Sequence, residues 1–441
     1  MFIKNFNVRG FKSLADVELV DLAAANILHG FNDVGKSNIL QAIDLYLQLL
    51  PQAIRSLDEP EDTWALTFSD LQPYTDAIFR RPGQREIVWQ ADVQLSNTRQ
   101  LVSPRLMLSG ENDRDGEFVL RLDWNGPAPE DNIKQQLIDD LAGGFNRIEA
   151  RRRLTVQWFS DETPPIEYNG DDSHGPIVQP DNLRQALLDA ALGQDWMRRK
   201  RFRTLVFLLN EHFGVGELEI ALGDRRPLPR TRADEPTRYG QEILLWLLRP
   251  EFPGPLPLED VGSGVRQILL VLAQVLLNPA RIVGIEEPEM NLNPEWQTRL
   301  MALLRDLAGP EPGQVNQIFI TSHSPQFEFA EHFYDVTYQD GQTRVERRPL
   351  DDRSKYFSLL GLSEPDGEDL GPYLNSQGQI KLPQRVIDDL NLRPREPVFF
   401  YKAEDGHWRL RTRDELLALM EAAEREMRDE EGGDDDTHRT G

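Results

Sequence analysis

The chain has 441 residues, of which 39% are hydrophobic, and its formal net charge is −25. With no cysteine it can form no disulfide, thiolate zinc site or cysteine nucleophile, and the acidic balance argues against nucleic-acid binding over the whole surface. No apolar run reaches the roughly 20 residues that cross a bilayer, and the N-terminus resembles no secretion signal, so we expect a cytoplasmic protein with no membrane partner.

Residues 1–50 predict two strands, a phosphate loop and a helix. The loop reads Gly30-Phe31-Asn32-Asp33-Val34-Gly35-Lys36-Ser37 and fits G-x-x-x-x-G-K-S at every fixed position, between an apolar strand and a helical pattern. Its glycines let backbone N–H groups approach phosphates, and the helix start adds positive charge. Lys36 is expected to contact the β- and γ-phosphates, and Ser37 to bind Mg²⁺. Only 8 lysines stand beside 41 arginines, so a lysine at this position suggests a role that the bulkier guanidinium cannot fill.

The middle of the chain predicts an antiparallel sheet and then a helical insertion. Residues 51–83 look like a loop-rich insertion. Alternating polarity and turn residues predict strands at 85–95, 100–108, 117–124 and 154–159. Helical spacing predicts helices at 132–141, 181–192, 201–212 and 241–248, and an Arg/Pro-rich loop covers 223–238. Two basic clusters, Arg147/Arg151/Arg152/Arg153 and Arg198/Arg199/Lys200/Arg201/Arg203, are either solvated faces or local nucleic-acid contacts.

From residue 256 to 329 strands and helices alternate with short connections, which predicts an α/β fold with a parallel sheet. The expected helices are 265–277 and 294–307, and the expected strands are 281–285 and 317–320. The first strand ends in Glu286 and Glu287, and strand ends of such sheets line the ligand crevice. We expect Glu286 to hold Mg²⁺, and Glu287 to position and deprotonate the attacking water.

Two further turns complete the expected site. The turn Val261-Gly262-Ser263-Gly264-Val265-Arg266-Gln267 opens an apolar helix and offers a second helix N-terminus for phosphate. The turn Thr321-Ser322-His323-Ser324 follows a strand, so His323 is a candidate γ-phosphate sensor.

These motifs together resemble the ABC-type ATPases of the RecF/SMC/OLD group, and most closely the AAA15/AAA21-type ATPases of bacterial anti-phage systems. The resemblance rests on Asn7–Leu14, the phosphate loop, the run Glu286–Pro294 and the Ser-His-Ser turn, and it frames residues 1–335. It implies a homodimer or higher oligomer that sandwiches ATP and Mg²⁺ between its heads. The phosphate loop and Glu287 then act in cis, and the turn Gly262–Gln267 caps the partner's γ-phosphate.

The residues carried over by this resemblance form three groups. The catalytic residues are Glu287 and His323, and the metal ligands are Ser37 and Glu286. The nucleotide-binding residues are Gly30, Asn32, Gly35, Lys36, Ser37, Asn38, Ser263 and Gly264. The sequence departs from the pattern where Glu286 replaces aspartate and where Gly262 and Ser263 exchange the expected order. Gln72 and Gln90 are the candidates for a Q-loop glutamine.

We expect four parts along the chain: an ATPase head at 1–350 with its helical insertion at about 131–255, a linker at 351–373, a small α+β unit at 374–412, and an acidic helix and tail at 413–441. The sequence of the small unit predicts a strand, a short helix and a hairpin. This pattern resembles the AbrB/SpoVT swapped-hairpin domain, and the resemblance implies dimerisation. It is too small to bury a core alone.

Two hypotheses about function follow. The first is a Mg²⁺-dependent ATPase that acts as the sensor or regulatory motor of an anti-phage defence or DNA-transaction complex, with a nuclease or toxin as a separate effector protein. The second is an ATP-responsive DNA-binding regulator that contacts DNA through the C-terminal dimer. An SMC-type clamp is disfavoured, because no long heptad run provides a coiled-coil arm.

Overall fold

The chain forms two compact units, Met1–Leu350 and Asp351–Gly441. The computed structural model describes residues 1–56, 63–67, 71, 86–110, 118–142, 144–149, 158–159, 182–227, 239–278, 281–309, 315–329, 332–348, 382, 387–388, 391–392, 398–402, 408–412, 415 and 417–418. Among these residues no helix is both long and apolar enough to span a membrane.

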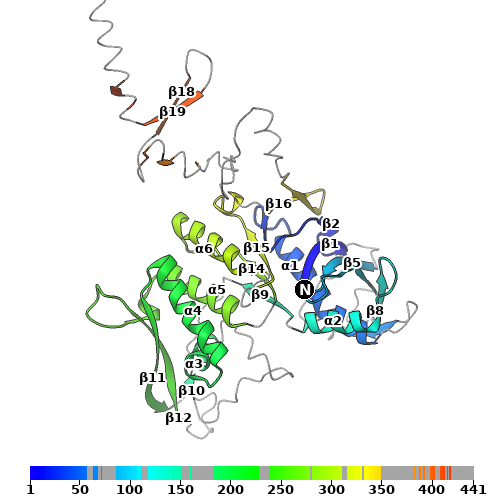
Figure 1. Ribbon diagram of the computed structural model, residues 1–441, viewed down its shortest axis with the longest axis horizontal. Coiled ribbons are helices and arrows are strands. Elements are labelled where there is room, and N and C mark those ends of the chain that lie inside the picture. The colour runs from blue at the N-terminus through cyan, green and yellow to red at the C-terminus, as the bar shows by residue number, and fades with distance from the viewer. Residues whose placement is uncertain are drawn as a thin grey trace, which may run out of the picture. The chain divides into compact units, whose positions relative to one another are not determined.

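A six-stranded mixed sheet forms the centre of the first unit (Figure 1), with the strand order β17-β16-β3-β15-β14-β9. Its strands are β3 (Ala25–His29), β9 (Phe145–Glu149), β14 (Ile282–Glu286), β15 (Gln317–Ser322), β16 (Phe333–Gln339) and β17 (Gln342–Arg347). All neighbours pair in parallel except β16 and β17, which form an antiparallel hairpin. The parallel core confirms the predicted α/β alternation.

Both faces of the central sheet are buried, and its strands alternate between two hydrophobic cores. Ile282 and Phe319 pack into the core that contains α1 (Lys36–Ser56). Val283 and Ile318 point to the opposite core. That core contains the helices α3 (Leu183–Leu192), α4 (Trp196–Phe213), α5 (Ser263–Leu277) and α6 (Pro294–Leu307). Side chains of α1 therefore face one set of strand positions, and this set includes Glu286.

The predicted antiparallel arm is present as a seven-stranded sheet on the α1 side of the unit (Figure 1). Its path runs β2-β1-β5-β7-β8-β4, and β6 pairs with β5. The strands are β1 (Phe2–Phe11), β2 (Leu14–Leu19), β4 (Trp64–Leu66), β5 (Glu86–Gln94), β6 (Leu101–Val102), β7 (Pro104–Ser109) and β8 (Phe118–Trp124), and α2 (Asp131–Leu141) follows them. Phe6 of β1 meets Tyr46 of α1 edge to face at 5.7 Å, so the arm and the phosphate-loop helix share one core.

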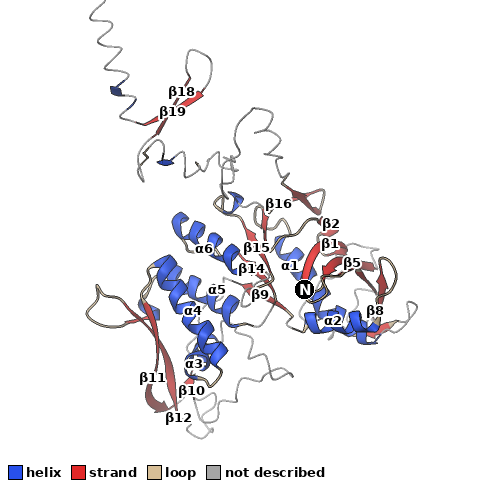
Figure 2. Ribbon diagram, viewed as in Figure 1, coloured by secondary structure: helices blue, strands red, loops and turns tan. Residues whose placement is uncertain are grey.

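The helix predicted at 241–248 is wrong, because this segment belongs to the strand β12 (Tyr239–Leu248) (Figure 2). It pairs with β11 (Glu217–Pro227), β10 (Trp158–Phe159) and β13 (Leu256–Pro257). Ile243, Leu245 and Leu247 are buried at every second position, which is the period of a strand. The expected loop at 223–238 overlaps the end of β11, and residues 228–238 lie outside the described residues.

The helix α4 begins five residues earlier than its apolar pattern predicts. Asp195 caps it, because its Oδ1 accepts hydrogen bonds from the backbone N–H groups of Met197 (2.8 Å) and Arg198 (3.4 Å). Gly214 ends it in the left-handed conformation. The basic cluster 198–203 therefore lies on the first turns of a helix.

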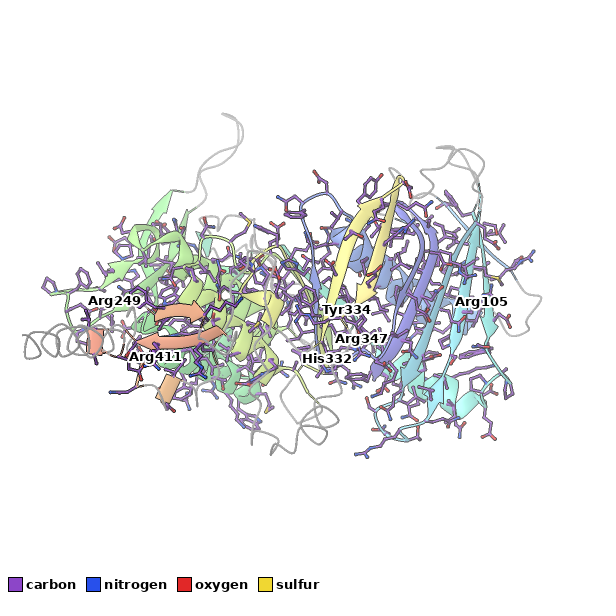
Figure 3. The ribbon with its side chains drawn as sticks, turned by 90° about the horizontal axis from the view of Figure 1, so that it is seen from above. Arg105, Arg249, His332, Tyr334, Arg347 and Arg411 are labelled. Atoms are coloured by element: carbon purple, nitrogen blue, oxygen red, sulfur yellow. The ribbon has the colours of Figure 1, made fainter. Side chains whose placement is uncertain are left out.

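The hairpin β16–β17 joins the central sheet to the antiparallel arm. Tyr334 and Arg347 are register partners in it (Figure 3). The Tyr334 hydroxyl donates to the Val20 carbonyl at 2.7 Å, and burial raises the pKa of this phenol well above its ordinary range. Arg347 pairs with Asp21 just after β2, so both strands of the hairpin are tied to the β1–β2 region.

In the second unit β18 (Val398–Lys402) and β19 (Trp408–Thr412) form an antiparallel hairpin, as the two strand-like runs predict. The linker at 351–373 and most of the acidic segment 413–441 lie outside the described residues. Short 3-10 turns at Leu258–Asp260 and Phe327–Phe329 complete the elements.

Candidate functional site

The phosphate loop connects β3 to α1, and both of its glycines are required by the packing around them. A Cβ at Gly30 would lie 2.2 Å from the Val336 carbonyl oxygen. A Cβ at Gly35 would lie 2.1 Å from Thr343 Oγ1, and the φ of Gly35 is +103°. Larger residues would therefore push the loop away from the sheet.

A small hydroxyl network from distant segments holds this loop in place. Thr343 Oγ1 donates to the Val34 carbonyl at 2.8 Å and lies 2.7 Å from Ser13 Oγ. Asn38 Nδ2 donates to the same Ser13 hydroxyl at 2.8 Å. Ser13 belongs to the β1–β2 turn and Thr343 to β17, so two hairpins hold the loop from one side.

Lys36 is buried, with 6% of its surface exposed. Its Nζ donates to the carbonyl oxygens of Gly30 (2.6 Å) and Phe31 (2.7 Å). The ammonium group therefore lies within the curve of the loop, where a phosphate would meet it.

Glu286 lies at the end of β14 and faces the first turn of α1. Ser37 Oγ donates to Glu286 Oε2 at 2.7 Å, which joins the two residues predicted as metal ligands. Arg147 of β9 pairs with Glu286 Oε1. The interpretation of Arg147 as part of a solvated or nucleic-acid-binding patch is thus wrong, because β9 brings it into the site; Arg151, Arg152 and Arg153 lie outside the described residues.

Glu287 begins the turn after β14 in a left-handed conformation, with φ of +47°. Its backbone N–H donates to the Thr321 carbonyl at 2.9 Å, which fixes the turn against β15. Its carboxylate is mostly buried, and Oε1 lies 3.8 Å from His323 Nδ1. A non-glycine residue at positive φ is uncommon and often marks a functional turn.

Glu289 is a site residue to which the sequence assigned no role. Only 3% of its surface is exposed. Its Oε1 accepts hydrogen bonds from Ser322 Oγ (2.6 Å) and the His323 backbone N–H (3.0 Å), and it lies 3.4 Å from His323 Nδ1. Among the described residues, Oε2 has no hydrogen-bond partner. Burial is the largest influence on this carboxyl and raises its pKa, against the opposing effect of these hydrogen bonds.

The predicted glycine turn lies beside the carboxylate loop. Gly262 caps α5, and Ser263 is exposed to solvent. A Cβ at Gly264 would lie 3.0 Å from the Asn291 carbonyl oxygen, so the start of α5 packs closely on the segment that follows Glu289.

The other predicted residues lie in several places. Asn32 is exposed at the tip of the phosphate loop, and Asn38 lies on α1. Gln90 lies in β5 of the antiparallel sheet, in register with Asn7 and Arg105, and Gln72 lies outside the described residues.

Comparison with known proteins shows the family of this chain. The family model described as "AAA domain, putative AbiEii toxin, Type IV TA system" matches residues 25–327, which is more than half of the chain. The chain belongs to this AAA-domain family. A curated relative is the uncharacterised protein MJ1542 of Methanocaldococcus jannaschii, which is 26% identical over 131 residues. This match covers 29% of the present AAA-domain chain and 14% of the relative.

Several solved structures are also similar to this AAA-domain protein. They are an SMC head bound to the C-terminal winged-helix domain of ScpA (16% identity, TM-score 0.48), the SMC head domain of Thermotoga maritima (13%, 0.44) and an SMC head with an extended coiled coil bound to a ScpA domain derived from Pyrococcus furiosus (15%, 0.46). They cover 80%, 79% and 82% of this chain, and the chain covers 99% or more of each.

Replacing Glu289 by glutamine should remove a contribution to the stability of the AAA-domain protein that falls as pH rises. A carboxyl whose pKa rises on folding from its ordinary value of 4.5 binds more protons in the folded state than in the unfolded state. The contribution of this carboxyl to the free energy of unfolding therefore falls as pH rises from 4.5 through the raised pKa, by about 1.4 kcal/mol for each pKa unit of the shift. Urea denaturation of the wild type and Glu289→Gln between about pH 5 and pH 8 tests this.

The matched control for this measurement is Glu18→Gln, because Glu18 is an exposed carboxylate on β2. It should leave the pH dependence of the wild type unchanged. An unfolding free energy of Glu289→Gln that varies with pH as steeply as that of the wild type would contradict the assignment.

Proposed function

We propose that this chain is a Mg²⁺-dependent ATPase whose heads pair around ATP and regulate a separate effector protein in an anti-phage defence or DNA-transaction complex. The observation that carries the proposal is the hydrogen bond between Ser37 and Glu286 beside the Lys36 loop. It joins a hydroxyl and a carboxylate next to the loop that holds a buried ammonium, and these are the groups that a magnesium-bound nucleotide needs.

The residues fit ATP and Mg²⁺ in charge and in shape. The backbone of Gly30–Gly35 would receive the phosphates, and the two glycines let this backbone pack closely on Val336 and Thr343. Ser37 and Glu286 would hold Mg²⁺ with help from phosphate oxygens and water. The nucleotide supplies the phosphoryl group. Glu287 would accept the proton of the attacking water, and His323 would donate a hydrogen bond toward the γ-phosphate.

Exposed groups around the site support pairing of two heads. Phe31 is 82% exposed at the tip of the phosphate loop, and Gly262 and Ser263 are exposed at the start of α5. A second copy that covered the loop with its own Ser263–Gly264 turn would bury these groups. Phe399 and Phe400 are exposed on the C-terminal hairpin, and a two-stranded hairpin is marginally stable alone, which favours a second contact between copies there.

A second component beside this chain is favoured by the description of the family, which names a putative toxin and a toxin–antitoxin system. Such a system has at least two components. The residues described around the phosphate loop fit nucleotide binding and hydrolysis. We therefore assign the effector activity, as a nuclease or toxin, to a partner protein.

Removal of Mg²⁺ should stop ATP turnover and prevent pairing of the heads. We expect the purified full chain to hydrolyse ATP in Mg²⁺ and to elute as a larger species with ATP than without it. An excess of EDTA should abolish the turnover, because without Mg²⁺ the Glu286 carboxylate would stand beside the phosphates with no cation between these negative charges. Phosphate release and light scattering measure the two effects, and turnover that persists in EDTA would overturn the metal assignment.

A further inference from the structure

One face of α4 carries exposed aromatic and basic side chains together. It consists of Trp196, Arg199, Lys200, Arg203 and Phe207, all exposed to solvent. Successive residues of an α-helix are rotated by about 100°, so these five positions fall within one arc of about 100°. We call this set the α4 outer face.

The opposite side of the helix is fixed in the core. Leu205, Leu209 and Phe213 are buried there, and Phe213 meets Trp296 of α6 edge to face at 5.5 Å. In Figure 1 α4 lies beside α5 in the helical layer of the unit. Packing against these helices means that α4 cannot rotate to bury its outer face.

The basic residues of the α4 outer face are not neutralised within the described part of the chain. Arg199, Lys200 and Arg203 make no side-chain hydrogen bond or ion pair with any described residue. In a chain of net charge −25, three such neighbouring cations form a local patch of positive surface charge. A polyanion is the ligand that matches such a patch.

The two aromatic side chains point to the kind of polyanion. Trp196 is 63% exposed and Phe207 is 61% exposed, and they lie at the two ends of the basic segment. At 1.5 Å per residue they are separated by about 16 Å along the helix. Aromatic side chains that flank phosphate-binding cations are typical of proteins that stack unpaired bases.

We propose that the α4 outer face binds single-stranded nucleic acid, with phosphates on Arg199, Lys200 and Arg203 and bases stacked on Trp196 and Phe207. This inference goes beyond the proposed ATPase and requires no nucleotide in the phosphate loop. Single strands are favoured over duplex, because a duplex offers no unpaired base to the two rings. The planar guanidinium groups suit phosphate oxygens.

The test is fluorescence anisotropy of the full chain with a labelled oligothymidine of about 30 nucleotides, without ATP. Wild type should bind it, and a duplex of equal length at least about 5-fold more weakly. The variant Arg199→Glu/Lys200→Glu/Arg203→Glu should bind at least about 10-fold more weakly. The slope of log affinity against log salt should be smaller in this variant than in wild type by about 2. Each single-strand phosphate contact contributes about 0.7 to this slope, and the variant removes three cations. Trp196→Ala/Phe207→Ala should bind about 30-fold more weakly, or more weakly still, with the salt slope unchanged.

Two control variants separate a local site from the overall charge. Arg55→Glu/Arg99→Glu/Arg121→Glu makes the same change in net charge at exposed positions outside α4 and should stay within about 2-fold of wild type. Phe252→Ala/Tyr338→Ala removes two other exposed rings and should also leave the affinity for the oligonucleotide unchanged.

Four results with nucleic acid would overturn the proposal. They are no binding at about 50 mM salt, equal losses in the two charge variants, a duplex affinity equal to that of the single strand, and an aromatic variant that binds like wild type. Polyglutamate is a further competitor to test. If wild type bound it as tightly as the oligonucleotide, and the same variants lost this binding, the ligand would be an acidic protein surface and the proposal would be overturned.

Discussion

Replacing Lys36 by alanine is expected to abolish measurable ATP binding while leaving the fold intact. The Lys36 ammonium is the buried cation of the phosphate loop and is held by the carbonyls of Gly30 and Phe31. Loss of one member of a buried charge pair typically costs roughly 2–5 kcal/mol, which is about 30-fold or more in affinity. Titration calorimetry with ATP and Mg²⁺ measures the loss.

Two further variants test whether the effect is specific to the Lys36 ammonium. Lys134→Ala removes a lysine on α2 whose partner is the exposed Asp131, so it should bind ATP like wild type. Lys36→Arg should not restore binding, because a guanidinium group is bulkier than an ammonium and holds its donors in a rigid plane. A Lys36→Ala protein that is folded by circular dichroism and binds ATP as wild type does would show that the phosphates lie elsewhere.

Replacing Glu287 by glutamine is expected to keep ATP binding and to lower turnover by about 10²–10⁴-fold. The amide keeps the shape of the carboxylate and the hydrogen bond of the Glu287 backbone to Thr321, but it cannot accept a proton from water. The ATP-bound pair of heads should then accumulate, because opening of the pair follows hydrolysis. Turnover and light scattering with ATP measure both effects.

Glu286→Gln is the matched comparison, since it changes the adjacent carboxylate. Glu286 bonds to Ser37 and Arg147, so its loss should weaken Mg²⁺-dependent ATP binding itself. If Glu287→Gln turned over ATP at the wild-type rate, Glu287 would not be the base. If both variants lost binding equally, the division of roles between metal ligand and base would be wrong.

Local motifs in the sequence predicted the central elements of this site. The phosphate loop, the strand β14 with its terminal acids, and the helix α6 follow from apolar spacing together with Gly, Pro and Asn at the element ends. Asn293 illustrates this, since its side chain caps α6 through the Trp296 N–H at 2.9 Å and Pro294 follows it.

The segment 241–248 shows where the spacing of apolar residues does not distinguish a helix from a strand. Residues 241–248 are apolar at nearly every position, so a helix and a buried strand fit the run equally well. Pairing with β11 decides it, and Leu218 opposite Leu247 is a contact that no local pattern reports.

The site residues that the sequence did not predict also depend on contacts with distant segments. Arg147 reaches Glu286 across 139 residues of sequence, and Ser13 reaches Thr343 across 330. Neither pair has a fixed spacing. Glu289 is adjacent to the acid pair, but its role depends on the buried hydroxyl of Ser322, and burial cannot be read from a single turn.

The hydroxyl network around the phosphate loop sets a minimum length for a working nucleotide site. The family-matched segment 25–327 includes the loop but neither Ser13 nor Thr343. A protein trimmed to that segment would have no side chain at Val34 O, and Asn38 would lose its acceptor. We therefore expect an ATP-binding fragment of this chain to need both hairpins, from β1 through Arg347, in addition to the nucleotide motifs.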